Sequence, residues 1–138
     1  MRVFILEDDP DRIMLLREAA FNHDAVFTES CLGPNGAIEV YARESAKAPF
    51  DLLLLDHDLG GRTFVDSNEE DTGAAFVRRL PDGGPTTIPY LPDVVIHSYN
   101  ADGAKNMLAT LREKGYRRSI YVPFGHATLR LLNPAYKW

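Results

Sequence analysis

Five short apolar segments recur along the chain, separated by stretches in which apolar residues have a different spacing. In the third segment, Leu52 to Leu55 are apolar without alternation, which is expected of a strand covered on both faces. All five segments have the length and character of buried strands. We predict strands at Arg2–Leu6, Ala25–Thr28, Asp51–Leu55, Val94–His97 and Ser119–Val122.

Between these segments the spacing of apolar residues becomes that of helices. After Asp9 and Pro10, for example, Ile13 and Leu16 fall on one helical face. Proline suits a first helical position, and the preceding aspartate can cap it. We predict helices at Pro10–Phe21, Ala37–Lys47, Thr72–Leu80, Ala101–Lys114 and His126–Leu132. Residues 60–71 are too polar for a core, and residues 81–92 are rich in Gly and Pro, so both are predicted loops.

This alternation predicts an α/β domain with a mostly parallel five-stranded sheet and helices on both faces. The expected strand order is 2-1-3-4-5, which makes strands 1 and 3 neighbours. In such sheets, ligands bind beyond the carboxyl ends of the strands. Asp8, Asp9 and Asp56 would therefore meet in space, although more than forty residues separate the first pair from the third residue.

Size and composition narrow the classes of function. The 138 residues are expected to form one domain, spanning positions 1–138. Twenty acidic residues against fifteen Lys and Arg give a net charge of −5, which argues against binding to duplex DNA. No apolar run approaches the roughly 20 residues of a membrane span, and no signal peptide precedes the first strand. With Cys31 as the only cysteine, we expect a cytoplasmic protein without a membrane anchor.

Acidic side chains directly follow the first and third predicted strands. Carboxylates within about 4–6 Å repel one another, and one close pair costs about 4 kcal/mol at an effective dielectric constant near 20. A divalent cation removes this cost, and a set of oxygen ligands favours Mg²⁺ or Mn²⁺. We therefore predict a metal site formed by Asp8, Asp9 and Asp56. The alternatives are a helix N-cap for Asp9 and a solvated loop acid for Asp8.

Histidines follow two of the same strands and are candidates for proton transfer. His57 lies between Asp56 and Asp58, and His97 ends the fourth strand. Because an imidazole changes protonation near neutral pH, we predict a catalytic group of Asp56, His57, Asp58 and His97. Asp58 is equally well explained as a turn residue that bonds its own backbone, since Leu59-Gly60-Gly61 follows it. Each histidine is equally well explained by a structural role.

The residues after the fourth strand are candidates for phosphate binding. Strand alternation points His97 and Ser98 to opposite faces, so a Ser98 that faces a phosphate leaves His97 beneath a helix. Asn100 and Gly103 open the fourth helix, whose free N–H groups suit an anion. We predict that Ser98, Asn100 and Gly103 bind phosphate. The alternative is that the residues opening the helix are no more than caps.

From Val3 to about Leu132 these positions resemble the receiver domain of two-component response regulators, a flavodoxin-like fold. Glu7-Asp8-Asp9 matches the acidic metal-binding cluster of that family, Asp56 its phosphoacceptor and Ser98 its switch hydroxyl. Val122-Pro123-Phe124 stands where the family has Lys-Pro-Phe. Valine replaces neither the charge nor the donors of the phosphate-binding lysine. The loop at residues 60–71 is also longer than receivers have at this point.

Two segments resemble a divergent branch of that superfamily, the cyclic-phosphate-processing receiver-like domains. They are Leu55-Asp56-His57-Asp58-Leu59-Gly60-Gly61 and His97-Ser98-Tyr99-Asn100 followed by Gly103-Ala104. This resemblance accounts for the histidines and the missing lysine together. It implies a phosphoesterase, dependent on Mg²⁺ or Mn²⁺, that acts on a cyclic phosphate. The implied partner is a small phosphorylated ligand, such as a nucleotide, or an RNA end.

Other functions remain open. One is a phosphoaccepting or pseudo-receiver signalling module, against which Val122 argues. Another is a non-catalytic binder of phosphorylated small molecules, which the histidines allow. Asp56-x-Asp58 after an apolar strand is also similar to haloacid-dehalogenase phosphatases, in which one Asp is the nucleophile and a second is the acid/base. That family has the motif on its first strand, however, and needs a downstream lysine in a set position.

Overall fold

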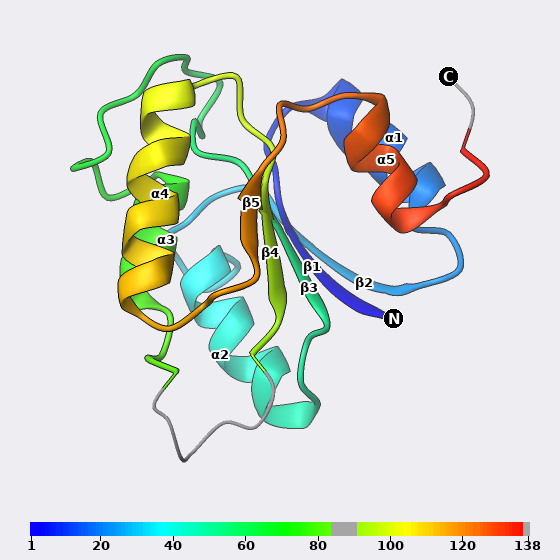
Figure 1. Ribbon diagram of the computed structural model, residues 1–138, viewed down its shortest axis with the longest axis horizontal. Coiled ribbons are helices and arrows are strands. Elements are labelled where there is room, and N and C mark those ends of the chain that lie inside the picture. Colours follow the sequence, from blue (N-terminus) through cyan, green and yellow to red (C-terminus); the bar gives the residue numbers. More distant parts are fainter. Residues whose placement is uncertain (84–90, 137–138) are drawn as a thin grey trace.

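The computed structural model describes residues 1–83 and 91–136, in which strands and helices alternate along the chain (Figure 1). The strands are β1 Arg2–Leu6, β2 Asp24–Thr28, β3 Leu52–Leu55, β4 Asp93–Ile96 and β5 Ser119–Tyr121. The helices are α1 Pro10–Ala19, α2 Ala37–Lys47, α3 Gly73–Arg79, α4 Ala101–Glu113 and α5 His126–Leu132.

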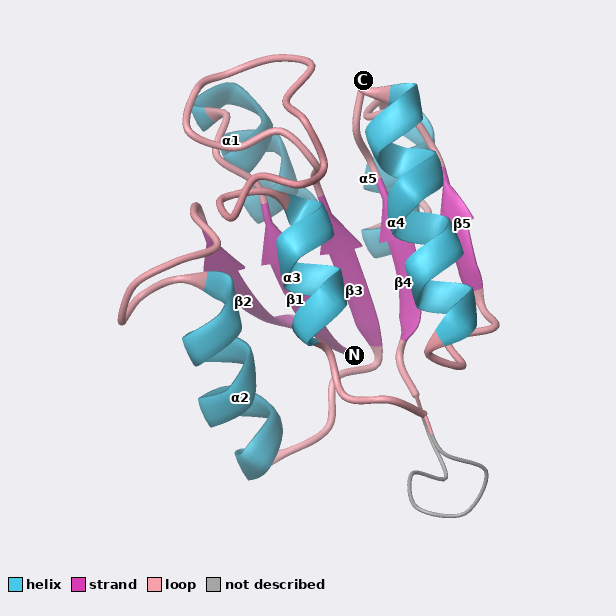
Figure 2. Ribbon diagram, turned by 90° about the vertical axis from the view of Figure 1, so that its left-hand side faces the viewer, coloured by secondary structure: helices cyan, strands magenta, loops and turns pink. Residues whose placement is uncertain are grey.

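The five strands form one parallel sheet in the order β2-β1-β3-β4-β5, which confirms the predicted topology. Helices α1 and α5 cover one face of the sheet, and α2, α3 and α4 cover the other (Figures 1 and 2). In the sheet register Ile5 pairs with Leu54, and Leu54 pairs with Val95. This row of three residues fixes which side chains meet just beyond the strand ends.

Alternate residues of the central strands enter two separate hydrophobic layers. Ile5, Leu54 and Val95 pack in the layer under α1 and α5. Their neighbours Leu6 and Leu55 pack in the layer under α2, α3 and α4. Since successive side chains of a strand point to opposite faces, the same alternation governs the polar residues that follow.

The predicted elements are all present, and their ends agree with the prediction to within two residues. The first helix ends at Ala19, two residues before the predicted Phe21, because the chain leaves helical geometry at Ala20. Helix α3 begins at Gly73, since the side chain of Thr72 caps it by accepting a hydrogen bond from the N–H of Ala75 at 3.1 Å. Residues 60–71 form a loop, as predicted. Most of the predicted loop at 81–92, residues 84–90, lies outside the described residues. In the described ranges no helix has the length and apolar character needed to cross a membrane.

Candidate functional site

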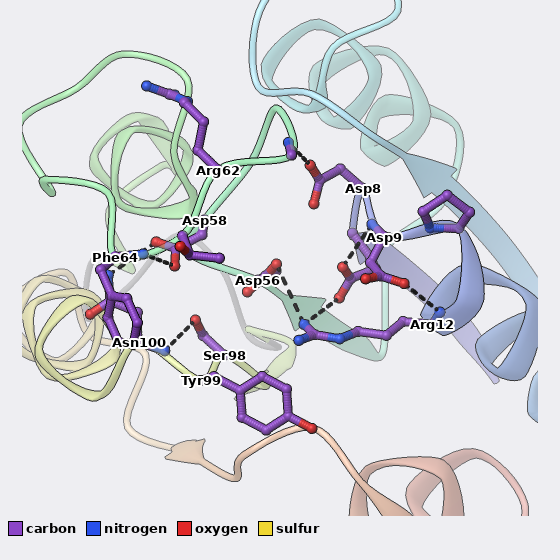
Figure 3. Close-up of a pocket in the computed structure, with 14 residues that line it drawn as sticks. Asp8, Asp9, Arg12, Asp56, Asp58, Arg62, Phe64, Ser98, Tyr99 and Asn100 are labelled. Atoms are coloured by element: carbon purple, nitrogen blue, oxygen red, sulfur yellow. Dashed lines mark hydrogen bonds and ion pairs between the residues drawn. The ribbon is translucent and has the colours of Figure 1, made fainter.

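A pocket lies at the carboxyl ends of β1, β3 and β4, between the loop at 60–71 and the start of α1 (Figure 3). Acidic, basic, hydroxyl and aromatic side chains from distant parts of the sequence line it together. They include Asp8, Arg12, Asp56, Phe64, Ser98 and Tyr99. The strand ends therefore form the kind of site that the topology predicts.

Three carboxyl groups form an acidic cluster in this pocket: Glu7, Asp8 and Asp56. Each offers an oxygen, and these oxygens lie within 4.8 Å of one another. Because Ile5 pairs with Leu54 in the sheet, the residues two positions further on, Glu7 and Asp56, extend the same row. Glu7 and Asp56 are buried, and Oε2 of Glu7 makes no hydrogen bond to a described residue. An all-oxygen set with one unsatisfied buried atom fits a hard divalent cation such as Mg²⁺ or Mn²⁺.

Burial favours the protonated forms of Glu7 and Asp56. It raises the pKa of Glu7 from 4.5 to about 8, and the neighbouring Asp56 adds to this increase. Burial also raises the pKa of Asp56 to about 7, although the Arg12 guanidinium, the His57 N–H and the Ser98 hydroxyl oppose the increase. Since metal ligation requires deprotonated carboxylates, a cation that binds here would release protons.

Arg12 extends from the first turn of α1 into the pocket. Its Nη1 lies 3.5 Å from Oε2 of Glu7 and 3.8 Å from Oδ2 of Asp56. Its guanidinium carbon lies 4.6 Å from the ring centroid of Tyr99 and 5.1 Å from that of Phe124. Arg12 is not among the residues predicted from the sequence. The only available signal was its place in the first turn of the helix that follows the acidic residues.

Asp9, a predicted metal ligand, caps helix α1. Its Oδ1 accepts hydrogen bonds from the N–H groups of Asp11 at 2.9 Å and Arg12 at 3.1 Å, which fits the N-cap alternative. Its own N–H donates to Oε1 of Glu7 at 3.0 Å. The structure thus groups Glu7, and not Asp9, with Asp8 and Asp56. Asp9 does line the pocket, and a metal contact by Asp9 stays a prediction.

His57 lies on the opposite side of the sheet from the acidic cluster. Its imidazole is fully buried, with Nδ1 2.8 Å from Oδ1 of Asp58 and Nε2 2.9 Å from Oγ of Ser67. Its backbone N–H donates to Oδ1 of Asp56 at 2.8 Å. The ring is not among the described groups that line the pocket. Proton transfer between His57 and a ligand stays a prediction, and it would need an intervening group.

Asp58 organises the loop at residues 60–71. Its Oδ2 accepts a hydrogen bond from the N–H of Phe64 at 2.7 Å, and its Oδ1 accepts one from the N–H of Val65 at 3.1 Å. Asn100 Nδ2 donates to the same Oδ1 at 3.0 Å. Partial burial acts to raise the pKa of Asp58, but hydrogen bonds from Asn100, His57 and the loop lower it. These contacts match the turn alternative. Since Asp58 also lines the pocket, its catalytic role stays a prediction.

His97 is fully buried behind the acidic cluster. Its ring centroid lies 5.8 Å from that of Phe124, and its Nδ1 lies 3.3 Å from Oε2 of Glu7. Burial, reinforced by the charge of Arg12, lowers the pKa of His97 to about 4, so the ring is neutral near pH 7. Ser98 lines the pocket and His97 does not, which is the opposed orientation expected from strand alternation. Catalysis by His97 stays a prediction.

Of the three predicted phosphate-binding residues, Ser98 and Asn100 line the pocket. The Ser98 hydroxyl oxygen accepts a hydrogen bond from the N–H of Asn100 at 3.1 Å. Asn100 Oδ1 caps α4 by accepting from the N–H of Gly103 at 2.9 Å. Gly103 is not on the pocket wall and packs against His57, where an added Cβ would lie 2.6 Å from the ring. Contact of these three residues with phosphate stays a prediction.

Two aromatic residues at the pocket rim were also not singled out from the sequence. Phe64 and Tyr99 are 77% and 61% exposed, and the Tyr99 hydroxyl donates to the carbonyl oxygen of Phe124 at 3.3 Å. Phe64 has a φ of 51°, which is rare for a bulky residue. By contrast, Val122 is partly buried in the layer under α1 and α5. It is not among the described residues that line the pocket.

The fold and the acidic cluster define a receiver-like α/β domain. Residues 5–113 match the model of a family described as the cyclic-phosphate processing receiver domain. The chain therefore belongs to this family, which confirms the resemblance found in the sequence. A search of curated proteins found no match.

Similar solved structures are receiver domains of response regulators. The phosphorylated cyanobacterial phytochrome response regulator RcpA shares 22% identity and a TM-score of 0.57, over 95% of this chain and 84% of that one. The BeF₃-activated receiver domain of Klebsiella pneumoniae RstA shares 24% identity and a TM-score of 0.55, over 95% and 93%. The Mn²⁺-bound form of the response regulator Rcp1 shares 15% identity and a TM-score of 0.57, over 97% and 91%. At these identities the similarity shows the fold alone.

Proposed function

We propose that the protein is a phosphoesterase, dependent on Mg²⁺ or Mn²⁺, that acts on a cyclic phosphate of a nucleotide or an RNA end. The observation that carries this proposal is the acidic cluster, which lies in an open pocket beside a hydroxyl and a guanidinium group. Membership of a family described by cyclic-phosphate processing supports the class of substrate.

Glu7, Asp8 and Asp56 would hold the metal ion. When bound, such an ion polarises a phosphoryl oxygen and lowers the pKa of a bound water. The backbone N–H of His57 holds one oxygen of Asp56 and so fixes the orientation of that carboxylate. Ser98 lies beside Asp56 and offers a hydroxyl to a phosphoryl oxygen.

The buried histidines fit positioning roles in this reaction. His97 lies 3.3 Å from Glu7, so a proton moved by His97 would pass through the Glu7 carboxyl. His57 contacts Asp58 at 2.8 Å, so a proton moved by His57 would pass through Asp58. Both carboxyl groups line the pocket, which supports such a path to a ligand.

A phosphoaccepting module is the second candidate, because Asp56 lies in the pocket next to Ser98 and the acidic cluster. The buried environment of Val122 weighs against it, since no lysine is present there to stabilise an aspartyl phosphate. We expect acetyl phosphate to label Asp56 poorly or transiently. Stable stoichiometric labelling, seen by intact mass, would return the protein to the phosphoaccepting class.

The test of the proposed function is incubation with Mg²⁺ or Mn²⁺ and a panel of 2′,3′-cyclic, 3′,5′-cyclic and linear phosphates. Phosphorus NMR follows the products, and Asp56→Asn is the inactive control. Turnover of a cyclic phosphate that requires metal and Asp56 supports the proposal. Binding of a cyclic phosphate without turnover would favour the non-catalytic binder.

The same assay tests the histidines. If one of them moves a proton, His57→Gln or His97→Gln should cut turnover by roughly 10²–10⁴-fold. Metal affinity should change little, because Mg²⁺ prefers oxygen ligands. Full activity in both variants would exclude the role in proton transfer. Loss of folding in His97→Gln alone would show that this side chain belongs to the core.

A further inference from the structure

Receivers have a lysine on strand 5 where this chain has Val122, but another cationic side chain reaches the pocket from α1. Figure 3 shows Arg12 extending from α1 toward Asp56. Two arginines line this pocket among the described residues, Arg12 and Arg62. Their surroundings differ in a way that decides which of them is available to a ligand.

Arg62 already has partners within its own loop. Its guanidinium forms an ion pair with Glu69 and donates to the carbonyl oxygens of Leu59 at 3.3 Å and Asp71 at 3.4 Å. It is also directed away from the acidic cluster in Figure 3. These contacts give Arg62 a structural role in the loop.

Arg12 has charge partners but no hydrogen-bond partners for its guanidinium among the described residues. Its ion pairs with Glu7 and Asp56, at 3.5 and 3.8 Å, are longer than the 2.7–3.2 Å of N–H···O hydrogen bonds. A guanidinium carries five N–H donors. These donors stay available in a side chain that is only 18% exposed and points into the pocket.

Two aromatic rings contact this guanidinium. It lies over Tyr99 and Phe124, and the hydroxyl of Tyr99 is itself held by the carbonyl oxygen of Phe124. A contact with a ring face uses none of the N–H donors of a guanidinium, so they remain free for hydrogen bonds. A planar guanidinium can bind two oxygens of a phosphate group at once.

We propose that Arg12 binds the phosphoryl oxygens of the ligand. It would thereby supply the positive charge that receivers provide with a lysine at the place of Val122. The proposal deepens the proposed function, since it rests on a phosphoryl ligand in this pocket. The competing role for Arg12 is purely electrostatic, in which it does no more than neutralise Glu7 and Asp56. The two roles differ in what happens to anion binding when lysine replaces Arg12, because this change keeps the charge but removes the planar guanidinium.

The test measures the affinity for inorganic phosphate by isothermal titration calorimetry in saturating Mg²⁺. Arg12→Gln should weaken phosphate binding by about 10- to 100-fold, the usual effect of losing hydrogen bonds to a charged group. Arg12→Lys, which keeps the charge but not the planar fork, should fall between Arg12→Gln and the wild type. In Arg12→Gln Mg²⁺ should also bind more tightly, because this change removes a positive charge beside the acidic cluster.

Arg17→Gln is the matched control. Arg17 is also on α1 and lies over an aromatic ring, with its guanidinium carbon 4.4 Å from the Phe27 centroid, but it does not line the pocket. Its removal changes the net charge equally and should leave phosphate affinity unchanged. An equal loss in Arg17→Gln and Arg12→Gln would reduce the effect to net charge and overturn the proposal.

Unchanged phosphate affinity in Arg12→Gln would overturn the proposal and leave turnover of cyclic phosphates as a separate question. If Arg12→Gln does not fold, wild-type affinity in Arg12→Lys overturns it instead. A wild-type protein that binds no phosphate in Mg²⁺ also overturns it. A protein that binds phosphate through Arg12 but hydrolyses none of the panel contradicts the phosphoesterase alone.

Discussion

Gly103 lies directly against the imidazole of His57, with no space for a side chain between them. A Cβ at position 103 would lie 2.6 Å from Cγ and Cδ2 of the ring. This close approach brings the start of α4 to the end of β3, where Asn100 reaches Asp58. It explains a glycine inside a helix, where glycine costs about 1 kcal/mol relative to alanine.

Gly103→Ala should therefore destabilise the protein although alanine favours helix. Displacing the buried ring should lower the free energy of unfolding by about 1–3 kcal/mol, the usual cost of overpacking. Urea unfolding measures the change. In a His57→Ser background, which leaves room for the methyl group, the same substitution should cost much less. Equal costs in both backgrounds would contradict the steric explanation.

The effect of metal on stability should distinguish the role of Asp56 as a metal ligand from the role of Asp9 as a helix cap. Millimolar Mg²⁺ or Mn²⁺ should raise the melting temperature, and Asp56→Asn should weaken this effect, since a cation that binds only the folded state stabilises it. Asp9→Ala should cost about 1 kcal/mol through loss of the α1 cap while the metal-induced shift remains. Thermal scans with and without metal measure both quantities. Loss of the shift in Asp9→Ala would identify Asp9 as a ligand, and no shift in the wild type would contradict the metal site.

The stability of the metal-free protein should fall as the pH rises through the pKa values of Glu7 and Asp56. The folded-state pKa values of Glu7 and Asp56, about 8 and about 7, lie above their ordinary values of 4.5 and 3.8. The folded state therefore binds more protons than the unfolded chain between about pH 4 and pH 8. The stabilisation that these protons provide is lost as the pH rises over that range. Urea unfolding in a chelator at pH 5 and pH 8 should show the decrease. Glu7→Gln should reduce it, and an unchanged slope would argue that Glu7 ionises normally.

The conformation of the loop at residues 60–71 should depend on the hydrogen bonds that Asp58 accepts. Asp58→Ala removes the acceptor for the N–H groups of Phe64 and Val65. Hydrogen exchange at these amides should accelerate roughly tenfold or more, since hydrogen bonds to charged groups contribute about 1.5–3 kcal/mol. Asp66→Ala, which removes only an acceptor for the N–H of Asn68, is the control within the same loop. Similar exchange in both variants would show that Asp58 does not hold the loop.

The fold could be predicted because its signals are local. The unbroken Leu52 to Leu55 run marks a central strand, and Asp9-Pro10 marks the start of a helix. The order of strands then follows from the alternation of elements and from the rules of parallel sheets. Helix and strand ends were less accurate, because they depend on single capping contacts such as that of Thr72 with Ala75.

The acidic cluster was predicted only in part, because adjacent acids look equivalent in sequence. Alternate residues of a strand point to the same face, and Ile5 pairs with Leu54, so the residues two positions later, Glu7 and Asp56, are expected to be neighbours. The same alternation would have separated Asp56 from His57. The place of Arg12 was beyond such reasoning, since a long side chain reaches wherever tertiary packing directs it. Its position depends on Tyr99 and Phe124, which come from distant parts of the chain.

For the evolution of this chain, the length of β3 matters as much as the identity of the residues that follow it. Removing a single residue from β3 would move every later side chain to the other face of the sheet. The imidazole of His57 would then lie at the acidic cluster in place of Asp56, and a carboxylate would lie beneath α4 where the imidazole had been. An insertion in the loop at residues 60–71 has no such effect, because no strand or helix runs through it. Related chains that differ in length are therefore expected to vary in this loop while the four residues of β3 keep their number.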